Sequence, residues 1–167
     1  MNRFSRILRH LAAPHWVVRR AFPRRTGDAV ADAVRRIERA YDIELRVAVE
    51  GGMPPLALLR GKTSRARAHE LFSQLGVWDT EHNCGVLVYV QFADRRIEIV
   101  ADRGIGAKVK QSEWDAACAA MTSEFRAGHF EAGMLEGISS LSKLIRQHVP
   151  PAPPGKRGEL PDRPAIL

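Results

Sequence analysis

The stretch from Asn83 to Ile105 constrains the fold of this chain more than any other. It reads NCGVLVYVQFADRRIEIVADRGI, and its two halves, Gly85–Phe92 and Arg95–Ala101, are rich in β-branched and aromatic residues. Such residues favour strands, and the two-residue connection between them, Ala93-Asp94, has the length that hairpins prefer. We therefore predict a buried antiparallel hairpin, with a polar corner at residues 102–104 where the second strand ends.

Apolar residues spaced three and four apart predict helices on both sides of this hairpin. The predicted helices are residues 26–41, 56–75 or 64–75, 112–127 and 130–148. Thr26 and Ser112 are the predicted N-caps of the first and third of these helices.

One further strand is predicted at Ile43–Val49, where alternating residues indicate one buried face and one partly covered face. A helix connects this strand to the hairpin, so the strand should lie parallel to the first hairpin strand. The element order is α-β-α-β-β-α-α. The predicted fold class is α/β, a small mixed-sheet α/β/α sandwich with a central antiparallel hairpin.

The excess of positive charge lies at the N-terminal end of the chain. The 167 residues carry 26 basic and 19 acidic side chains, a net charge of +7, and residues 1–25 hold seven arginines and no acid. Without those seven, 19 basic side chains face 19 acidic ones, so nucleic-acid binding by the fold itself is not expected. We divide the chain into a basic amphipathic segment at 1–25, a domain at 26–149 and a disordered or extended proline-rich tail at 150–167.

The N-terminal segment has three interpretations. Phe4, Ile7, Leu8 and Leu11 recur at helical spacing, with arginines beside them. The helix could pack this apolar stripe on the domain, which we favour, could lie on an anionic membrane surface, or could bind nucleic acid or another acidic partner. The arginines available for a membrane surface are Arg3, Arg6, Arg9, Arg19 and Arg20.

The chain shows no secretory signal, no apolar run long enough to span a membrane, and two distant cysteines, Cys84 and Cys118. We expect a cytoplasmic protein, peripheral to the inner membrane if the N-terminal segment binds there. Two glycine-rich stretches lack the spacing of nucleotide-binding loops. Leu56 stands where a P-loop ending at Gly61-Lys62-Thr63-Ser64 needs glycine, and Val109 where a dinucleotide fingerprint starting at Gly104 needs one.

The hairpin, its flanking helices and the pattern Phe125-Arg126-Ala127-Gly128-His129-Phe130-Glu131-Ala132-Gly133 resemble the TPM domain family over about residues 28–148. The resemblance implies an α/β sandwich with a divalent-cation site near the strand ends and, in some members, weak acid phosphatase activity. Many members carry a signal peptide and a membrane anchor, so this chain is similar to a short cytoplasmic branch that has neither.

The chain departs from the family pattern at the positions linked to the cation. Asn83-Cys84-Gly85 stands where the family has Asp-Asn-Gly, and Asp102-Arg103-Gly104 where it has Gly-x-Gly. The nearest acid to the family's Leu-Thr-Asp is Glu113. Ca²⁺ or Mg²⁺ would be held by oxygen ligands, with Arg103 as a phosphate clamp. The candidate ligands are Asp79, Glu81, Asn83, Asp102 and Glu113.

Two functions remain open. The favoured one is a non-catalytic or weakly active interaction module that binds a protein partner or a membrane surface, because acidic residues of the family's cation site are replaced in this chain. The alternative is a divalent-cation-dependent, acid-phosphatase-like hydrolase of phosphate esters. Two residues have a further interpretation each. Asp102 could pair with an arginine and cap local backbone, and Cys84 beside His82 could be a nucleophile. No catalytic residue is assigned.

Overall fold

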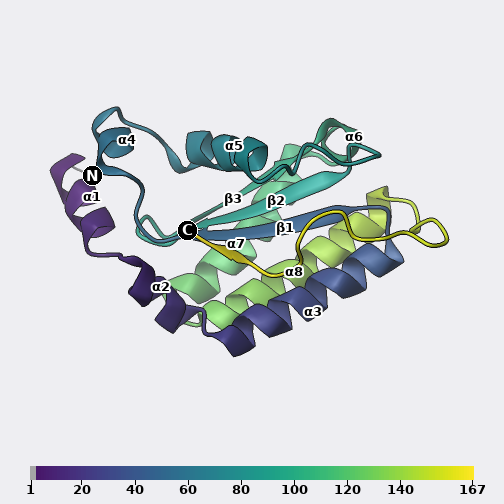
Figure 1. The fold of residues 1–167 in the computed structure, drawn as a ribbon, viewed down its shortest axis with the longest axis horizontal. Helices are drawn as coiled ribbons and strands as arrows, with labels where there is room; N and C mark the ends of the chain where they lie inside the picture. The colour runs from purple at the N-terminus through teal and green to yellow at the C-terminus, as the bar shows by residue number, and fades with distance from the viewer. Residues whose placement is uncertain (1–2) are drawn as a thin grey trace.

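A computed structural model describes residues 3–167, with side chains from Phe4 onward, and Arg3 therefore lies outside the described side chains (Figure 1). The helices are α1 (Arg3–Leu11), α2 (His15–Ala21), α3 (Arg24–Ala40), α4 (Pro55–Leu59), α5 (Ser64–Gln74), α6 (Arg103–Gly106), α7 (Gln111–Arg126) and α8 (Phe130–His148). The strands are β1 (Glu44–Glu50), β2 (Gly85–Gln91), β3 (Arg96–Ala101) and β4 (Ala165–Ile166).

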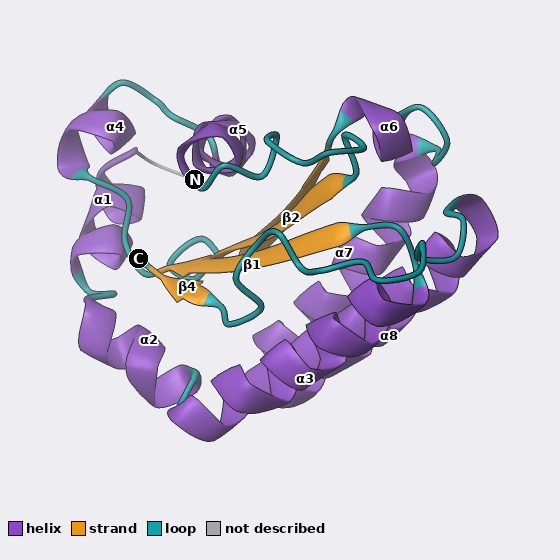
Figure 2. Cartoon of the chain, turned by 45° about the vertical axis from the view of Figure 1, so that its right-hand side comes forward, coloured by secondary structure: helices purple, strands orange, loops and turns teal. Residues whose placement is uncertain are grey.

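The strands form one mixed sheet in the order β3-β2-β1-β4. β1 and β2 are parallel, with Glu44 opposite Gly85 and Glu50 opposite Gln91, while β2 and β3 form the antiparallel hairpin. Helices α3, α7 and α8 lie on one face of the sheet and α5 lies on the other (Figures 1 and 2). The predicted α/β/α sandwich and the parallel crossover are confirmed.

The sheet separates two apolar cores. The larger core joins the inner face of β1, β2 and β3 to α3, α7 and α8. The smaller core, beneath α5, includes Ala48, Leu71 and Tyr89. Every residue of β1 is buried, because α5 and the C-terminal tail cover the face that the sequence pattern predicts to be only partly covered.

Several predicted boundaries shift for local reasons. The hairpin connection has four residues rather than two, because Gln91 Oε1 accepts the Asp94 N–H at 2.9 Å and Arg95 adopts a positive φ of 51°. α3 begins before Thr26, whose buried hydroxyl bonds Glu131 on α8 instead of capping the helix. Lys110 rather than Ser112 precedes α7.

The stretch between β1 and β2 contains two helices, α4 and α5. The sequence predicts a single helix there, beginning at either residue 56 or residue 64. Gly61 adopts a φ of 75° between them, and the Thr63 side chain caps α5 by accepting the Ala66 N–H at 3.1 Å. The Gly61-Lys62-Thr63-Ser64 run is therefore a turn and a helix cap.

The tail is more ordered than its proline content predicts. Its last residues pair as β4 with the outer edge of β1, Ala165 opposite Ala48 and Ile166 opposite Val49. Arg46 donates to the carbonyl oxygen of Pro161 at 2.6 Å. Of the two expectations for the tail, disordered or extended, the structure shows the extended one at β4, because β1 has an open edge and buried charges that the tail satisfies.

Candidate functional site

The predicted polar corner is built around Asp102, which directly follows β3 and is the N-cap of α6. Its Oδ1 accepts the Arg103 N–H at 2.6 Å, and its own N–H donates to Gly85 O at 2.8 Å. The residue is 8% exposed, and its Oδ2 has no hydrogen-bond partner among residues 4–167. The interpretation of Asp102 as a backbone cap therefore describes one of its two oxygens, and the other oxygen is buried and unpaired.

Backbone packing closes the same corner. The Gly104 N–H donates to Asn83 O at 3.0 Å, and a Cβ at position 104 would lie 2.5 Å from that oxygen. A Cβ at position 85 would lie 1.8 Å from Val77 O. Both glycines are required because the loop before β2 lies directly against them. Gly85 and Gly104, the glycines shared with the family pattern, thus have a structural role here.

Of the remaining predicted ligands, Asn83 lies at this corner through its backbone oxygen, which accepts the Gly104 N–H. Asp79, Glu81 and Asn83 are exposed, and so is Arg103. Glu113 lies at the start of α7, where its carboxylate accepts the Lys110 N–H at 3.0 Å and contacts His148 Nε2 at 3.2 Å. The backbone bond from Lys110 lowers the pKa of Glu113, with a further contribution from His148.

A divalent cation needs several oxygen ligands around one point. Within the part of the chain that the structure describes, no three His, Cys, Asp or Glu side chains are grouped closely enough to hold a metal ion. Asp102 contributes a single unpaired oxygen. At this corner the ends of the strands pack closely together, and one oxygen of the Asp102 carboxylate has no hydrogen-bond partner in the described residues.

Cys84 does not form a nucleophile pair with His82. The Cys84 residue is buried, and burial raises the pKa of its thiol although the Thr80 hydroxyl acts in the opposite direction. His82 Nδ1 instead contacts Asp42 Oδ2 at 2.8 Å. A protonated, buried thiol lacks the thiolate character that nucleophilic catalysis needs.

A second polar cluster, at the opposite end of the sheet, was not predicted. Asp94 in the hairpin turn accepts Arg6 Nη2 at 2.7 Å and lies 3.1 Å from His10 Nε2, and both partners come from α1. His10 Nδ1 accepts the Met53 N–H at 2.9 Å. Burial alone would raise the pKa of Asp94, but the hydrogen bonds from His10 and Arg6 outweigh it and hold the pKa well below its usual range.

This cluster sets the orientation of α1. The helix turns Arg6 and His10 toward the domain and leaves most of its apolar stripe exposed, with Phe4 67%, Leu8 52% and Leu11 60% exposed and Ile7 half-buried. The expectation that the stripe packs on the domain is wrong. The buried Asp94 carboxylate requires cationic or hydrogen-bonding partners, and the polar face of α1 supplies them.

The outward stripe of α1 belongs to a larger surface. Of the seven large apolar side chains that are exposed among residues 4–167, six lie on α1, α2 and α4. α1 packs against α4, and the three helices occupy one end of the molecule (Figure 1). We call this set the apolar end surface: Phe4, Leu8, Leu11, Trp16, Leu56 and Leu59. Exposed arginines lie on or beside the same helices, namely Arg9, Arg19, Arg20 and Arg60.

The architecture defines a small α/β sandwich protein with a four-stranded mixed sheet and no assembled metal centre in the described residues. Residues 20–144 match the family model of the TPM domain, and the chain belongs to this family. The resemblance seen in the sequence is thereby confirmed.

Two solved structures share the fold. The NMR structure of the BA42 protein from the psychrophilic bacterium Bizionia argentinensis has a TM-score of 0.72 at 27% identity, covering 86% of this chain and 93% of that one. The NMR structure of an N-terminal domain from P. gingivalis has a TM-score of 0.56 at 18% identity, covering 70% and 73%. No curated protein matches the chain. Among the described residues, no helix has the length and apolar character needed to cross a membrane.

Proposed function

We propose that this TPM-domain protein is a non-catalytic interaction module that docks on an anionic membrane surface through the apolar end surface. The observation that carries the proposal is the inverted orientation of α1, which holds Phe4, Leu8 and Leu11 in solvent. A helix packed only for stability would bury those side chains. Apolar groups concentrated on one end of a monomer mark a surface for a partner or a membrane.

The chemistry of the apolar end surface suits a lipid interface. Each large apolar side chain contributes up to roughly 1.5–3 kcal/mol when fully removed from water. Each arginine close to an anionic headgroup layer adds about 1 kcal/mol. Stable peripheral attachment generally needs both contributions, and the exposed arginines on these helices supply the second. Arg6 and Arg9 both lie within ion-pair distance of Asp94, at 2.7 and 3.7 Å, so the arginines that serve the membrane are Arg19 and Arg20.

Flotation with lipid vesicles tests this proposal. Full-length protein should float with vesicles containing roughly 30% phosphatidylserine and should remain in solution with vesicles of neutral lipid alone. Leu8→Glu with Leu11→Glu should abolish flotation. The matched control is Trp78→Glu, because Trp78 is the one exposed large apolar residue in the described chain that lies off this surface. Undiminished flotation of the double variant would refute the docking surface.

One observation favours a second function, a divalent-cation-dependent hydrolase of phosphate esters. The buried, unpaired Oδ2 of Asp102 is a site that a cation could satisfy, and Arg103 stands next to it in the chain. Ca²⁺ or Mg²⁺ should then raise the melting temperature of the protein and support turnover of a generic phosphate ester, and Asp102→Asn should remove both effects. Absence of a shift and of turnover would eliminate this function.

A further inference from the structure

The edge of β3 is open, and it lies beside a basic groove. β3 is an outer strand of the sheet, whereas the opposite edge is closed by β4. A groove of about 660 Å³ lies along β3, with walls from α5 and α7. Unpaired strand edges are templates for another strand, so natural proteins usually cover or block them.

The pairing register identifies the backbone groups that face outward. The Asp102 N–H donates to Gly85 O, so alternate residues of β3 bond β2 and the residues between them point to the open edge. These outward residues include Ile97 and Ile99. Arg65 from α5 donates to Ile99 O and thus blocks that position. By the same register, the N–H and C=O of Ile97 point to the open edge.

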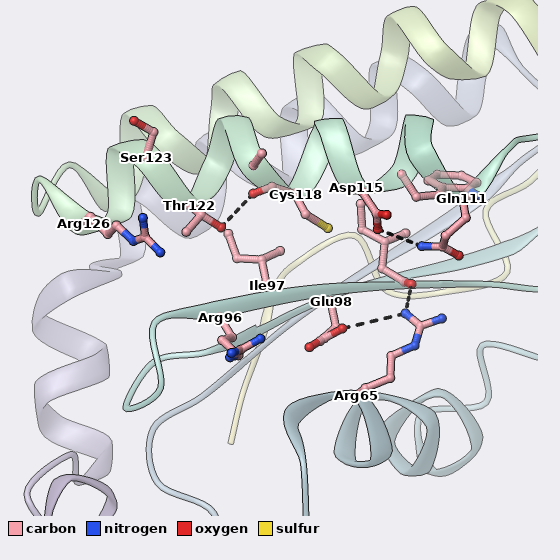
Figure 3. Close-up of a pocket in the computed structure, with 13 residues that line it drawn as sticks. Arg65, Arg96, Ile97, Glu98, Gln111, Asp115, Cys118, Thr122, Ser123 and Arg126 are labelled. Carbon is pink, nitrogen blue, oxygen red and sulfur yellow. Dashed lines mark hydrogen bonds and ion pairs between the residues drawn. The ribbon is translucent and has the colours of Figure 1, made fainter. Parts of the chain in front are cut away.

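The charges around Ile97 favour an acidic occupant. Figure 3 shows Arg96 and Arg126 toward one end of the groove and Gln111 and Asp115 toward the other. Asp115 is already bonded by the Gln111 amide at 2.9 Å. Arg96 and Arg126 are exposed and make no ion pair within the described chain. Glu98 also lines the groove, but it is paired with Arg65 at 3.9 Å, so the groove holds three guanidinium groups against two carboxylates, Glu98 and Asp115.

We propose that the open edge of β3 takes up an extended acidic segment of a partner protein as an added strand, with carboxylates of that segment paired to Arg96 and Arg126. The backbone of the segment bonds both groups of Ile97, and the guanidinium forks select its acidic side chains. The same sheet already accepts a short segment at its other edge, where two residues of the tail form β4 and Arg46 holds the chain before them.

The experiment uses the full-length protein and a labelled synthetic peptide of about eight residues that alternates valine with glutamate, the period that a strand presents on one face. Binding is measured by fluorescence anisotropy, and the exchange rate of the Ile97 amide by NMR. The acidic peptide should bind and should slow exchange of the Ile97 amide. A peptide with lysine in place of glutamate should not bind.

Two variants and one modified peptide make the outcome decisive. Arg96→Glu with Arg126→Glu should weaken binding by at least about tenfold. The matched control, Arg36→Glu with Arg146→Glu, reverses two exposed arginines on α3 and α8 and should leave the affinity unchanged. The acidic peptide with N-methylated backbone keeps its charge but cannot pair with a strand, and it should lose binding. Equal binding of the N-methylated peptide, or of the Arg96 and Arg126 variant, would overturn the proposal.

Discussion

Arg6 on the first helix and Asp94 in the hairpin turn are 88 residues apart in the chain and form a two-point ion pair, with Arg6 Nε and Nη2 lying 3.0 and 2.7 Å from Asp94 Oδ2. His10, one helical turn further along α1, contacts the same carboxylate. This pair fixes which face of α1 meets the domain, and so it determines that the apolar stripe faces outward.

Asp94→Asn should loosen α1. Removing the carboxylate charge weakens the hydrogen bonds from Arg6 and the 3.1 Å contact with His10, and hydrogen bonds to charged groups contribute roughly 1.5–3 kcal/mol each. We expect the free energy of unfolding to fall by about 2–4 kcal/mol and amide exchange across α1 to accelerate. Denaturant titration and hydrogen exchange measure these two effects. Asp79→Asn, at an exposed carboxyl, is the control and should change neither.

The pH dependence of this contact follows from the lowered pKa of Asp94. A carboxyl with a folded-state pKa below its unfolded value stabilises the protein fully above the unfolded pKa, near 4, and loses that contribution as the pH falls further. The acid-induced loss of stability should therefore be smaller in Asp94→Asn than in the parent. An identical slope in both proteins would contradict the role given to this carboxylate.

Glu38 should produce the opposite slope. Burial raises the pKa of Glu38 to about 8, although the backbone bond from Leu45 opposes the shift. The folded state therefore holds a proton that the unfolded state releases near pH 4, so stability should decrease as the pH rises from about 4 to about 8. Glu38→Gln keeps an oxygen for the Leu45 N–H and should flatten this slope. Thermal melts across this pH range give the measurement.

The tail should be an integral part of the fold. Lys156 Nζ lies 3.1 Å from Glu44 Oε1, and Glu44 is fully buried. Lys156→Met leaves that carboxylate without its counter-charge, and breaking such a pair from one side typically costs about 3–5 kcal/mol. Adding Glu44→Gln should restore part of the loss. A Lys156→Met protein as stable as the parent would show that the tail does not hold the strand ends.

Two Gly→Ala substitutions should act in opposite directions. At Gly104 a Cβ would meet Asn83 O at 2.5 Å, so Gly104→Ala should destabilise the corner by about 1–3 kcal/mol. At Gly27, inside α3, a Cβ meets nothing within 4 Å. Gly27→Ala should therefore stabilise the protein by roughly 0.5–1 kcal/mol through helix propensity. Equilibrium unfolding of both variants checks the pair.

The sequence predicts the fold well because apolar spacing carries the information. α8 spans Phe130–His148 as the periodicity indicates, and the hairpin strands differ by one residue at each turn end. The contacts between distant residues were beyond sequence patterns. Nothing local marks Asp94 as the acceptor for α1, although seven arginines without an acidic neighbour could have prompted a search for one. The predicted ligand set stays a prediction, because whether such side chains meet depends on the fold, and in the described chain no three His, Cys, Asp or Glu side chains form a group that could hold a metal ion.

Trp16 reports directly on whether the apolar end surface enters a membrane. Trp16 lies on α2 within that surface, and Trp114 is buried, so Trp78→Phe leaves Trp16 as the exposed tryptophan of the described chain. Vesicles of anionic lipid with brominated acyl chains should shift its fluorescence to the blue and quench it, because bromine quenches only on close contact. Unchanged emission at saturating lipid would contradict the account.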